Sequence, residues 1–364
     1  MQTTSLAAVF EGPRQPFSLR ELPLHPPEHG GVLVRISMAT VCGSDVHSWA
    51  GRRPSPAPGI LGHEMTGVVM ELGGGDVADL RGDPLRIGDR ITWSEYIPCW
   101  QCERCVRLGL PQKCRRLRKY GHQSLSEPPG LLGGFAQYCH LLPGTAVLRL
   151  PPFVSDAEAV TVNCAGATMA AVIEAAEVGL GDCVVVQGLG ALGLWGVALA
   201  RAVGARAVIG LDTVESRLDM ARRFGATLAL PVGDTSPERL RELTALHSQT
   251  GGADAVIETA GVPSALYEGL GLLRPGGRYV TAGLVLPTAP VEIDASVLVR
   301  SMLTVRGVHN YQPWHLAQAL DFAGRSRGHI PIEDLVDAQL PLHRINEAFA
   351  YATARRGVRT AIVP

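Results

Sequence analysis

The sequence predicts an α/β protein that combines a β-rich part with a parallel, helix-covered sheet. Two observations lead to this fold class. Short apolar runs separated by Gly and Pro extend to about residue 150, and strand and helix patterns alternate from residue 183 onward. A length of 364 residues suggests two domains rather than one large core.

The apolar runs of the first part are short, and turn residues stand between them. This pattern is typical of antiparallel strands. We expect strands at residues 32–36, 67–72, 90–93 and 135–141. An Ala-rich stretch with few helix breakers then predicts a helix at residues 158–176.

The second part repeats a strand followed by a helix. We expect strands at residues 183–187, 207–211, 255–258, 278–282 and 302–305, with helices at 192–203, 216–224, 236–246 and 264–273. Such alternation implies a parallel sheet covered on both faces. The tail predicts helices at 315–324 and 343–353 and a last strand at 360–363.

Charge and hydropathy exclude several classes of partner. The formal net charge is −1, so no global basic field is present to hold nucleic acid or an anionic membrane. No segment reaches the roughly 18 uninterrupted apolar residues of a membrane span. The first ten residues lack the basic patch and long apolar run of a signal peptide. We therefore expect a cytoplasmic protein.

A glycine motif follows the first strand of the alternating part. Gly188, Gly190 and Gly193 form Gly-x-Gly-x-x-Gly between a predicted strand and a predicted helix. The glycines permit a tight turn, approach of a pyrophosphate to the backbone and close strand–helix packing. Although the motif alone is weak in a chain with 42 glycines, its position between strand and helix predicts a dinucleotide site.

An acid ends the second strand of the alternating part. Asp212 lies 24 residues after Gly188, where a carboxylate binds the adenosine ribose hydroxyls and repels a 2′-phosphate. The next residue is Thr213 rather than the Arg of many NADP sites, so we expect NAD. Arg217 follows one helical turn later and is either a contact to the ribose or a solvated helix charge.

Eight cysteines are present, and four of them are closely spaced. Cys99, Cys102, Cys105 and Cys114 lie within 16 residues, in a segment rich in Arg and Lys. Four thiolates at short spacing are typical of a structural zinc site, and an iron–sulfur cluster is the alternative. The competing interpretation is that these are four unrelated thiols. In that case free cysteines would be exposed in a polar segment, where thiols are prone to oxidation.

Other candidate ligands are scattered. Cys42 lies in Cys-Gly-Ser-Asp-Val-His, His63 in Gly-His-Glu-Met-Thr-Gly, and Cys164 shortly before the glycine motif. Two Cys and one His with an open fourth position are a ligand set of catalytic zinc. Spacing alone does not group these three residues, since a lone His is more often an ordinary hydrogen-bonded residue.

These motifs occur in the order found in the zinc-containing medium-chain dehydrogenase/reductase family, which the sequence resembles over essentially its whole length. The resemblance implies a GroES-like catalytic domain at residues 1–158 and 310–364. It also implies a Rossmann NAD-binding domain at residues 159–309. Stretches at residues 110–114, 119–122 and 142–145 are similar to a subgroup labelled phosphonate-catabolism-associated alcohol dehydrogenases.

The resemblance also implies roles for single residues. It makes Cys42, His63 and Cys164 catalytic zinc ligands, with Glu64 as an acidic neighbour that coordinates the metal in some members. Ser44 and His47 resemble the family's proton relay, and Arg359 resembles an arginine that contacts the cofactor pyrophosphate. Glu64 and Glu158 are rivals of Cys164 for the third ligand position, because carboxylates also bind zinc.

The sequence departs from the family pattern in two places, and the second departure leaves the substrate class open. The gap between Cys105 and Cys114 is eight residues, one longer than expected, which predicts a distorted loop. The motif that begins at Cys42 is similar to polyol dehydrogenases, whereas Cys164 is similar to alcohol dehydrogenases. Substrates to be considered are polyols, cyclitols, other small hydroxylated compounds and hydroxyphosphonates.

Together these features predict a zinc-dependent oxidoreductase that transfers hydride between NAD and an alcohol or carbonyl compound, with two zinc ions per chain. We expect a homo-oligomer, either dimer or tetramer. The alternatives are a zinc-free quinone or enoyl reductase and a non-catalytic binding protein of the same fold. The reductase would lack the four-cysteine run and the catalytic Cys–His pair, and the binding protein would tend to lose the ligands.

Overall fold

The computed structural model describes residues 3–287, 290–354 and 357–364. The chain forms two compact units. Unit 1 consists of Met1–Ala167, Gln312–Arg325 and Ile332–Pro364, and unit 2 of Thr168–Tyr311 and Ser326–Pro331. The main divisions thus fall after residues 167 and 311, compared with predicted divisions after residues 158 and 309.

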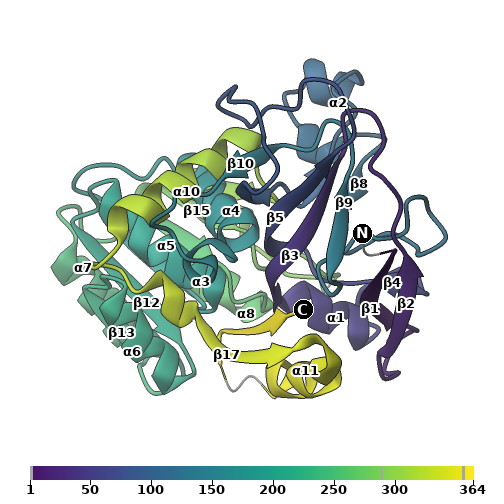
Figure 1. The fold of residues 1–364 in the computed structure, drawn as a ribbon. Coiled ribbons are helices and arrows are strands. Elements are labelled where there is room, and N and C mark those ends of the chain that lie inside the picture. The colour runs from purple at the N-terminus through teal and green to yellow at the C-terminus, as the bar shows by residue number, and fades with distance from the viewer. Residues whose placement is uncertain (1–2, 288–289, 355–356) are drawn as a thin grey trace. The chain divides into compact units, whose positions relative to one another are not determined.

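Unit 1 is built on a seven-stranded sheet in the order β10-β6-β5-β3-β18-β17, with β9 also paired to β3. Its strands are β3 (Val32–Val41), β5 (Glu64–Leu72), β6 (Arg90–Trp93), β9 (Tyr138–Leu141), β10 (Val147–Arg149), β17 (Val336–Pro341) and β18 (Arg359–Val363). The pairs are antiparallel apart from β17 with β18. Because β18 pairs with β3, the end of the chain completes a sheet that begins near its start (Figure 1).

Smaller elements surround this sheet. A three-stranded sheet consists of β1 (Thr4–Phe10), β2 (Ser18–Pro23) and β4 (Gly59–Ile60). A two-stranded ribbon consists of β7 (Tyr96–Ile97) and β8 (Arg118–Lys119). The helices are α1 (Gly43–Trp49), α2 (Glu103–Val106), α3 (Asp156–Ala159), α10 (Pro313–Ser326) and α11 (Ile345–Thr353). Short 3₁₀ turns occupy Pro111–Lys113, Ile332–Leu335 and Leu342–Arg344.

Unit 2 contains the predicted parallel sheet, in the order β13-β12-β11-β14-β15-β16. The strands are β11 (Cys183–Gln187), β12 (Ala207–Asp212), β13 (Leu228–Pro231), β14 (Ala253–Glu258), β15 (Leu273–Thr281) and β16 (Thr304–Gly307). The helices are α4 (Ala167–Ala175), α5 (Ala191–Ala202), α6 (Glu215–Arg223), α7 (Pro237–His247), α8 (Pro263–Leu270) and α9 (Ala295–Arg300). Helices α5, α6 and α8 pack on the strands (Figure 1).

The segment expected to be helical at residues 158–176 is helical over most of its length, but it is not one continuous α-helix. The segment contains α3, a π-helical turn at Val162–Gly166 and α4. The Asn163 side chain lies in the turn and donates to the backbone oxygens of His63 and Trp93, each at 2.9 Å. These tertiary bonds hold the chain in the wider turn, which Ala content alone does not predict.

Smaller differences arise at element ends. The helix expected to reach residue 273 ends at Leu270, and Leu273 already begins β15. The strand expected at residues 302–305 occupies Thr304–Gly307 instead. Strands β1, β2, β13 and β17 were not predicted, although β1 contains a continuous apolar run and β17 alternates apolar with polar residues.

The core of unit 1 contains a group of aromatic rings. The Phe349 ring on α11 lies 4.5 Å from the Phe17 ring, 5.7 Å from the Phe135 ring and 6.4 Å from the Trp49 ring, measured between centroids. Phe349 is 2% exposed. It therefore fixes α11 to the rest of unit 1 by apolar burial.

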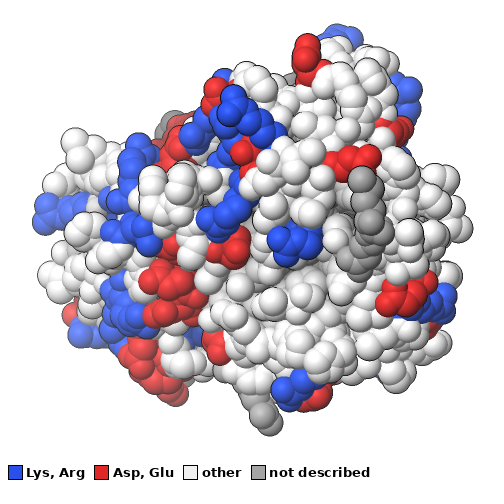
Figure 2. Space-filling view, in the orientation of Figure 1, with Lys and Arg blue, Asp and Glu red and all other residues white. Residues whose placement is uncertain are grey.

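The surface carries charges of both signs. In Figure 2, Lys and Arg adjoin Asp and Glu mainly on the left of the face, whereas its centre and right are largely uncharged. Among the described residues, no helix combines the length and the apolar character needed to cross a membrane. The cytoplasmic location stays a prediction.

Phe349→Ala should lower the free energy of unfolding by about 3–5 kcal/mol, because it leaves a cavity among three other rings. Ile87, which is 68% exposed in the same unit, provides the control. Ile87→Ala should change stability by less than about 0.5 kcal/mol. Urea unfolding measures both, and equal losses in the two variants would contradict this view of the core.

Candidate active site and metal centres

Cys42 stands at the junction of β3 and α1, and the Asp45 carboxylate fixes it there. The backbone N–H of Cys42 donates to Asp45 Oδ2 at 2.9 Å, which satisfies an amide at the start of the helix. Asp45 is fully buried. The Cys42 side chain is therefore held by the first turn of α1 rather than by a flexible loop.

The same carboxylate orients His63. Asp45 Oδ1 accepts from the backbone N–H of Gly62 at 3.2 Å and lies 3.4 Å from His63 Nδ1. Gly62 has φ +88, and a Cβ there would meet the Phe135 ring at 2.9 Å, so only glycine fits. Burial lowers the pKa of His63, but the Asp45 charge outweighs it and raises the pKa well above its ordinary value. A carboxylate behind Nδ1 makes Nε2 a stronger metal ligand.

Cys164 joins these two residues from the π-helical turn. One ligand atom each from Cys42, His63 and Cys164 lie within 4.8 Å of one another. A hydrogen bond from Cys164, together with the charge of Arg359, holds the pKa of Cys42 well below its usual range despite burial. The turn thus places a second sulfur beside a thiolate and an imidazole, which is a soft ligand set that suits zinc.

Glu64 and Arg359 form a buried ion pair beside Cys42. Arg359 Nε and Nη2 lie 2.6 and 2.9 Å from the two Glu64 oxygens, and Nη2 lies 3.5 Å from Cys42 Sγ. The Thr40 hydroxyl also donates to Glu64. Both Glu64 oxygens are therefore engaged, and Glu64 lies outside the set of converging ligand atoms.

The other rival carboxylate is engaged as well. Glu158 Oε2 accepts from the backbone N–H and the hydroxyl of Ser155, at 2.7 and 2.8 Å, at the start of α3. This is a capping arrangement. The geometry therefore favours Cys164 over both carboxylates as the third ligand.

Ser44 lies at the converging ligands, and His47 lies one helical turn further along α1. Ser44 Oγ is 3.3 Å from His63 Nε2, on the side away from Asp45. His47 is half-buried. Ser44 is half-buried as well, so the proton relay assigned to these two residues stays a prediction.

The four clustered cysteines also converge. Their sulfurs lie within 4.8 Å of one another, and backbone N–H groups of Cys99, Cys102 and Arg116 donate to sulfurs of the cluster at 3.2–3.3 Å. Backbone donors at Gln101 and Cys102 lower the pKa of Cys99 to about 5. The long gap before Cys114 is taken up by a 3₁₀ turn, and the set still closes.

The glycine motif in unit 2 has the stereochemistry expected of a pyrophosphate loop. Gly188 has φ +86, and a Cβ on Gly193 would lie 1.8 Å from the Gly188 oxygen. A Cβ on Gly190 would meet nothing within 4 Å, because Gly190 borders open space at the start of α5. Two glycines thus serve packing, and the third leaves the helix N-terminus accessible.

Asp212 is fixed at the end of β12. Its Oδ2 accepts from the Leu189 N–H at 2.6 Å, and its Oδ1 accepts from the N–H groups of Thr213 and Val214 at 2.7 and 3.0 Å. Arg217 Nη1 lies 3.9 Å from Asp212 Oδ2. Asp212 is therefore placed beside the glycine loop, with Arg217 next to it.

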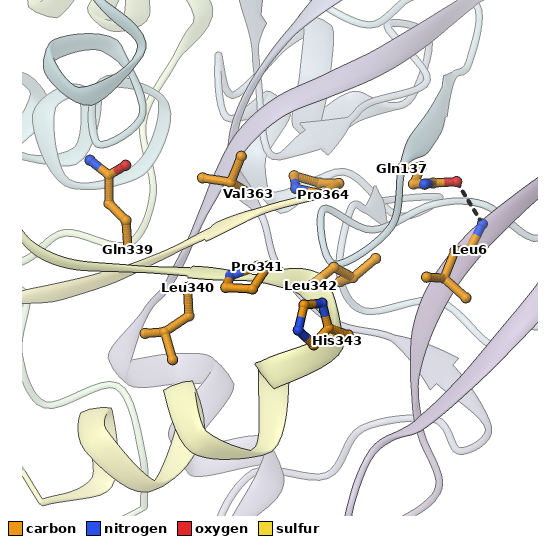
Figure 3. Close-up of a pocket in the computed structure, with 9 residues that line it drawn as sticks. All are labelled: Leu6, Gln137, Gln339, Leu340, Pro341, Leu342, His343, Val363 and Pro364. Atoms are coloured by element: carbon orange, nitrogen blue, oxygen red, sulfur yellow. Dashed lines mark hydrogen bonds between the residues drawn. The ribbon is translucent and has the colours of Figure 1, made fainter.

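A cavity of about 530 Å³ lies beside β17 and the end of the chain in unit 1. Figure 3 shows its mainly apolar lining, with Gln137, Gln339 and His343 as polar members. None of the candidate ligands or relay residues lines it. This cavity is therefore not the candidate active site.

Comparison with known proteins identifies the family. A profile described as "Alcohol dehydrogenase GroES-like domain" matches residues 28–152, and one described as "Zinc-binding dehydrogenase" matches residues 191–325. The chain is 33% identical over 344 residues to 5-exo-hydroxycamphor dehydrogenase of Pseudomonas putida, covering 94% of each chain. The chain belongs to the zinc-containing medium-chain alcohol/polyol dehydrogenase family.

Further medium-chain dehydrogenases agree. The chain is 31% identical to "Probable D-xylulose reductase A" of Neosartorya fischeri, over 98% of this chain and 96% of the relative. A crystal structure of an alcohol dehydrogenase from Thermotoga maritima has a TM-score of 0.95 at 34% identity, and covers 100% of both chains. A zinc-binding dehydrogenase from Sinorhizobium meliloti, solved with NADP, has a TM-score of 0.87 at 27% identity over 100% of both chains.

This medium-chain dehydrogenase is thus an oxidoreductase that acts on small alcohol or carbonyl compounds, with zinc and a nicotinamide cofactor. The predicted α/β fold, with a GroES-like part and a Rossmann-like sheet, is confirmed. The phosphonate-associated subgroup and the oligomeric state stay predictions. So does the pyrophosphate contact of Arg359, whose guanidinium here binds Glu64.

One residue of this dehydrogenase site was missed by the sequence analysis. Glu95 follows β6, is 4% exposed, and places Oε2 3.8 Å from His63 Nε2. Burial raises its pKa, but the nearby Lys119 charge outweighs this and leaves the pKa below its ordinary value. A single acid after an apolar strand gave no motif by which to find it.

Cys102→Ser should remove one zinc ion from the dehydrogenase and lower its melting temperature, because closed structural zinc sites contribute folding free energy. Cys139→Ser is the matched control, since Cys139 is a buried cysteine outside both clusters. Elemental analysis and thermal unfolding measure the effect. A Cys102→Ser protein with full zinc content and parental melting would contradict a structural metal site at this cluster.

Proposed function

We propose that the protein is an NAD-dependent alcohol dehydrogenase with a catalytic zinc at Cys42, His63 and Cys164 and a structural zinc at the four clustered cysteines. The observation that carries the proposal is the incomplete ligand set. Three ligand atoms converge at the first site, whereas four converge at the second. Catalytic zinc has three protein ligands and an open position, and structural zinc has four.

The residues present fit a zinc ion in the open set. Two sulfurs and one imidazole are borderline-soft donors, the Cys42 pKa is lowered, and Asp45 lies behind His63 Nδ1. Arg359 lies 3.5 Å from Cys42 Sγ and partly offsets the negative charge of two thiolates. The site therefore supports the binding of a divalent cation by this chain.

When bound, zinc would polarise the substrate oxygen as a Lewis acid, and the nicotinamide would exchange hydride with the substrate carbon. The chain itself handles the proton. The Ser44 hydroxyl, 3.3 Å from His63 Nε2, can accept a proton and pass another on, because a hydroxyl is both donor and acceptor. His47 then delivers it toward solvent, because imidazole titrates near neutral pH.

Asp212 supports NAD rather than NADP. Its carboxylate is held at the end of β12 by three backbone N–H groups, next to the loop that would bind pyrophosphate. A fixed negative charge there repels a 2′-phosphate. Arg217 is paired with this carboxylate, which reduces its availability for a phosphate.

An exposed sheet edge supports a homo-oligomer. Strand β16 is the last strand of the unit 2 sheet, and all four of its residues are exposed. Exposed apolar side chains lie on and near it, at Val297, Val299, Met302 and Val305. Since proteins rarely leave an apolar edge strand uncovered, a second copy of the chain suits this edge.

Replacement of Asp212 by Ser together with Thr213 by Arg should shift the ratio of kcat/KM for NAD over NADP by about 10²-fold or more toward NADP. The change removes the carboxylate and adds a cation where the 2′-phosphate would lie. Asp219→Asn, which alters an exposed acid of α6, is the control. Equal use of both cofactors by the parent enzyme would contradict the role of Asp212.

Cys164→Ala tests the proposed reaction. The variant should lose one of two zinc ions and nearly all NAD-linked alcohol oxidation, while NAD binding and the second zinc remain. Glu158→Gln, which alters a rival carboxylate, should keep both ions. Zinc analysis, steady-state kinetics and NAD titration measure these outcomes. If Cys164→Ala keeps both zinc ions and Glu64→Ala loses one, Glu64 is the third ligand instead.

A further inference from the structure

A buried carboxylate, Glu95, lies close to the proposed zinc ligand His63 and takes no part in the proposed proton transfer. Glu95 Oε2 is 3.8 Å from His63 Nε2, the ring nitrogen that points away from Asp45. Glu95 is not among the residues whose ligand atoms converge within 4.8 Å in the described part of the chain. Its position therefore suits contact with a molecule bound at the open position better than contact with the metal.

Lys119 holds this carboxylate in place. Lys119 Nζ lies 3.3 Å from Glu95 Oε1, the oxygen opposite the one that faces His63. The Lys119 side chain is 14% exposed and that of Glu95 is 6% exposed, so the pair is shielded from water. One oxygen is thus anchored, and the other is directed toward the site.

A second buried polar side chain lies close to His63. The His122 ring lies 5.4 Å from the His63 ring, between centroids, and His122 follows closely after Lys119. Its Nδ1 is buried and has no hydrogen-bond partner among the residues that the structure describes. A buried polar nitrogen without a partner costs free energy, so a polar ligand at this position would satisfy it.

The chemistry of a carboxylate limits what Glu95 can recognise. An ionised carboxylate only accepts hydrogen bonds, so its partner must be a donor. The reacting hydroxyl loses its proton and becomes a carbonyl oxygen, which cannot donate. A partner that survives the whole reaction must therefore be a second donor group on the substrate, close to the reacting carbon.

We propose that Glu95, positioned by Lys119, is a specificity-determining residue that accepts a hydrogen bond from a hydroxyl next to the reacting carbinol. The preferred substrates are then vicinal diols and polyols rather than simple alcohols. This inference rests on the proposed zinc site and deepens the proposed function. It assigns to Glu95 a role in selection, whereas Ser44 and His47 keep the proton transfer.

The first test compares two probes that differ by one hydroxyl, butane-2,3-diol and butan-2-ol, with NAD. The parent should favour the diol in kcat/KM by about tenfold or more, because a site built to bind a hydroxyl rejects the analogue that lacks it. Glu95→Gln should remove that preference, because its loss of kcat/KM should be about tenfold larger for the diol than for butan-2-ol. Glu127→Gln, an exposed acid paired with Arg118, is the matched control and should keep the preference.

Two kinetic outcomes would overturn the proposal. A parent without preference for the diol contradicts it, and so does an equal loss on both probes in Glu95→Gln, which would make Glu95 part of the proton path. If Glu95→Gln leaves Lys119 unpaired and unfolds, the double variant Glu95→Gln with Lys119→Met removes the buried charge. That folded variant should show the same loss of diol preference.

A binding measurement provides a readout that does not depend on turnover. Calorimetric titration of the zinc-loaded parent should give tighter binding of butane-2,3-diol than of butan-2-ol, and Glu95→Gln should abolish the difference. If the parent retains zinc and oxidises butan-2-ol but does not select the diol, the role of Glu95 is refuted while the proposed function stands. Loss of zinc or of all alcohol oxidation in the parent would refute the proposed function instead.

Discussion

The buried carboxylate of Asp45 is the interaction on which the arrangement of the site depends. It accepts from the backbone N–H groups of Cys42 and Gly62 and faces His63 Nδ1. One side chain therefore joins the end of β3 to the loop before β5 and sets the ring orientation of a candidate ligand. Because the group is fully buried, removal of its partners would leave a charge without compensation.

Two further polar groups extend this framework to distant parts of the chain. The Asn163 amide donates to the backbone oxygens of His63 and Trp93, and so places the turn that carries Cys164. Arg359, at the start of the last strand, binds Glu64 and approaches Cys42. The site thus requires the chain to return to the first sheet, and the pairing of β18 with β3 provides that return.

The sequence predicted those features whose signal is local. The run from Cys99 to Cys114 and the glycines from Gly188 to Gly193 carry their chemistry in their spacing, and the strands around them have clear apolar runs. The structure brings both sets into the geometry that this spacing indicates.

Features that depend on tertiary contacts were not predicted from the residues. Cys42, His63 and Cys164 are far apart in sequence, and only the family resemblance grouped them. The π-helical turn was missed because its cause, the bonds of Asn163, lies in other strands. Glu95 was missed for the same reason, since its significance comes from His63 and Lys119 rather than from its neighbours in sequence.

We propose that zinc in this protein has two different ligand sets, one closed and one open. X-ray absorption at the zinc edge of the fully loaded protein measures this most directly. The account predicts an average of about three sulfur and one nitrogen or oxygen neighbours per zinc, with Zn–S near 2.3 Å and Zn–N near 2.0–2.1 Å. An average of four sulfur neighbours per zinc would contradict it. So would an average of about two and a half sulfur neighbours, which is expected if a carboxylate replaces Cys164.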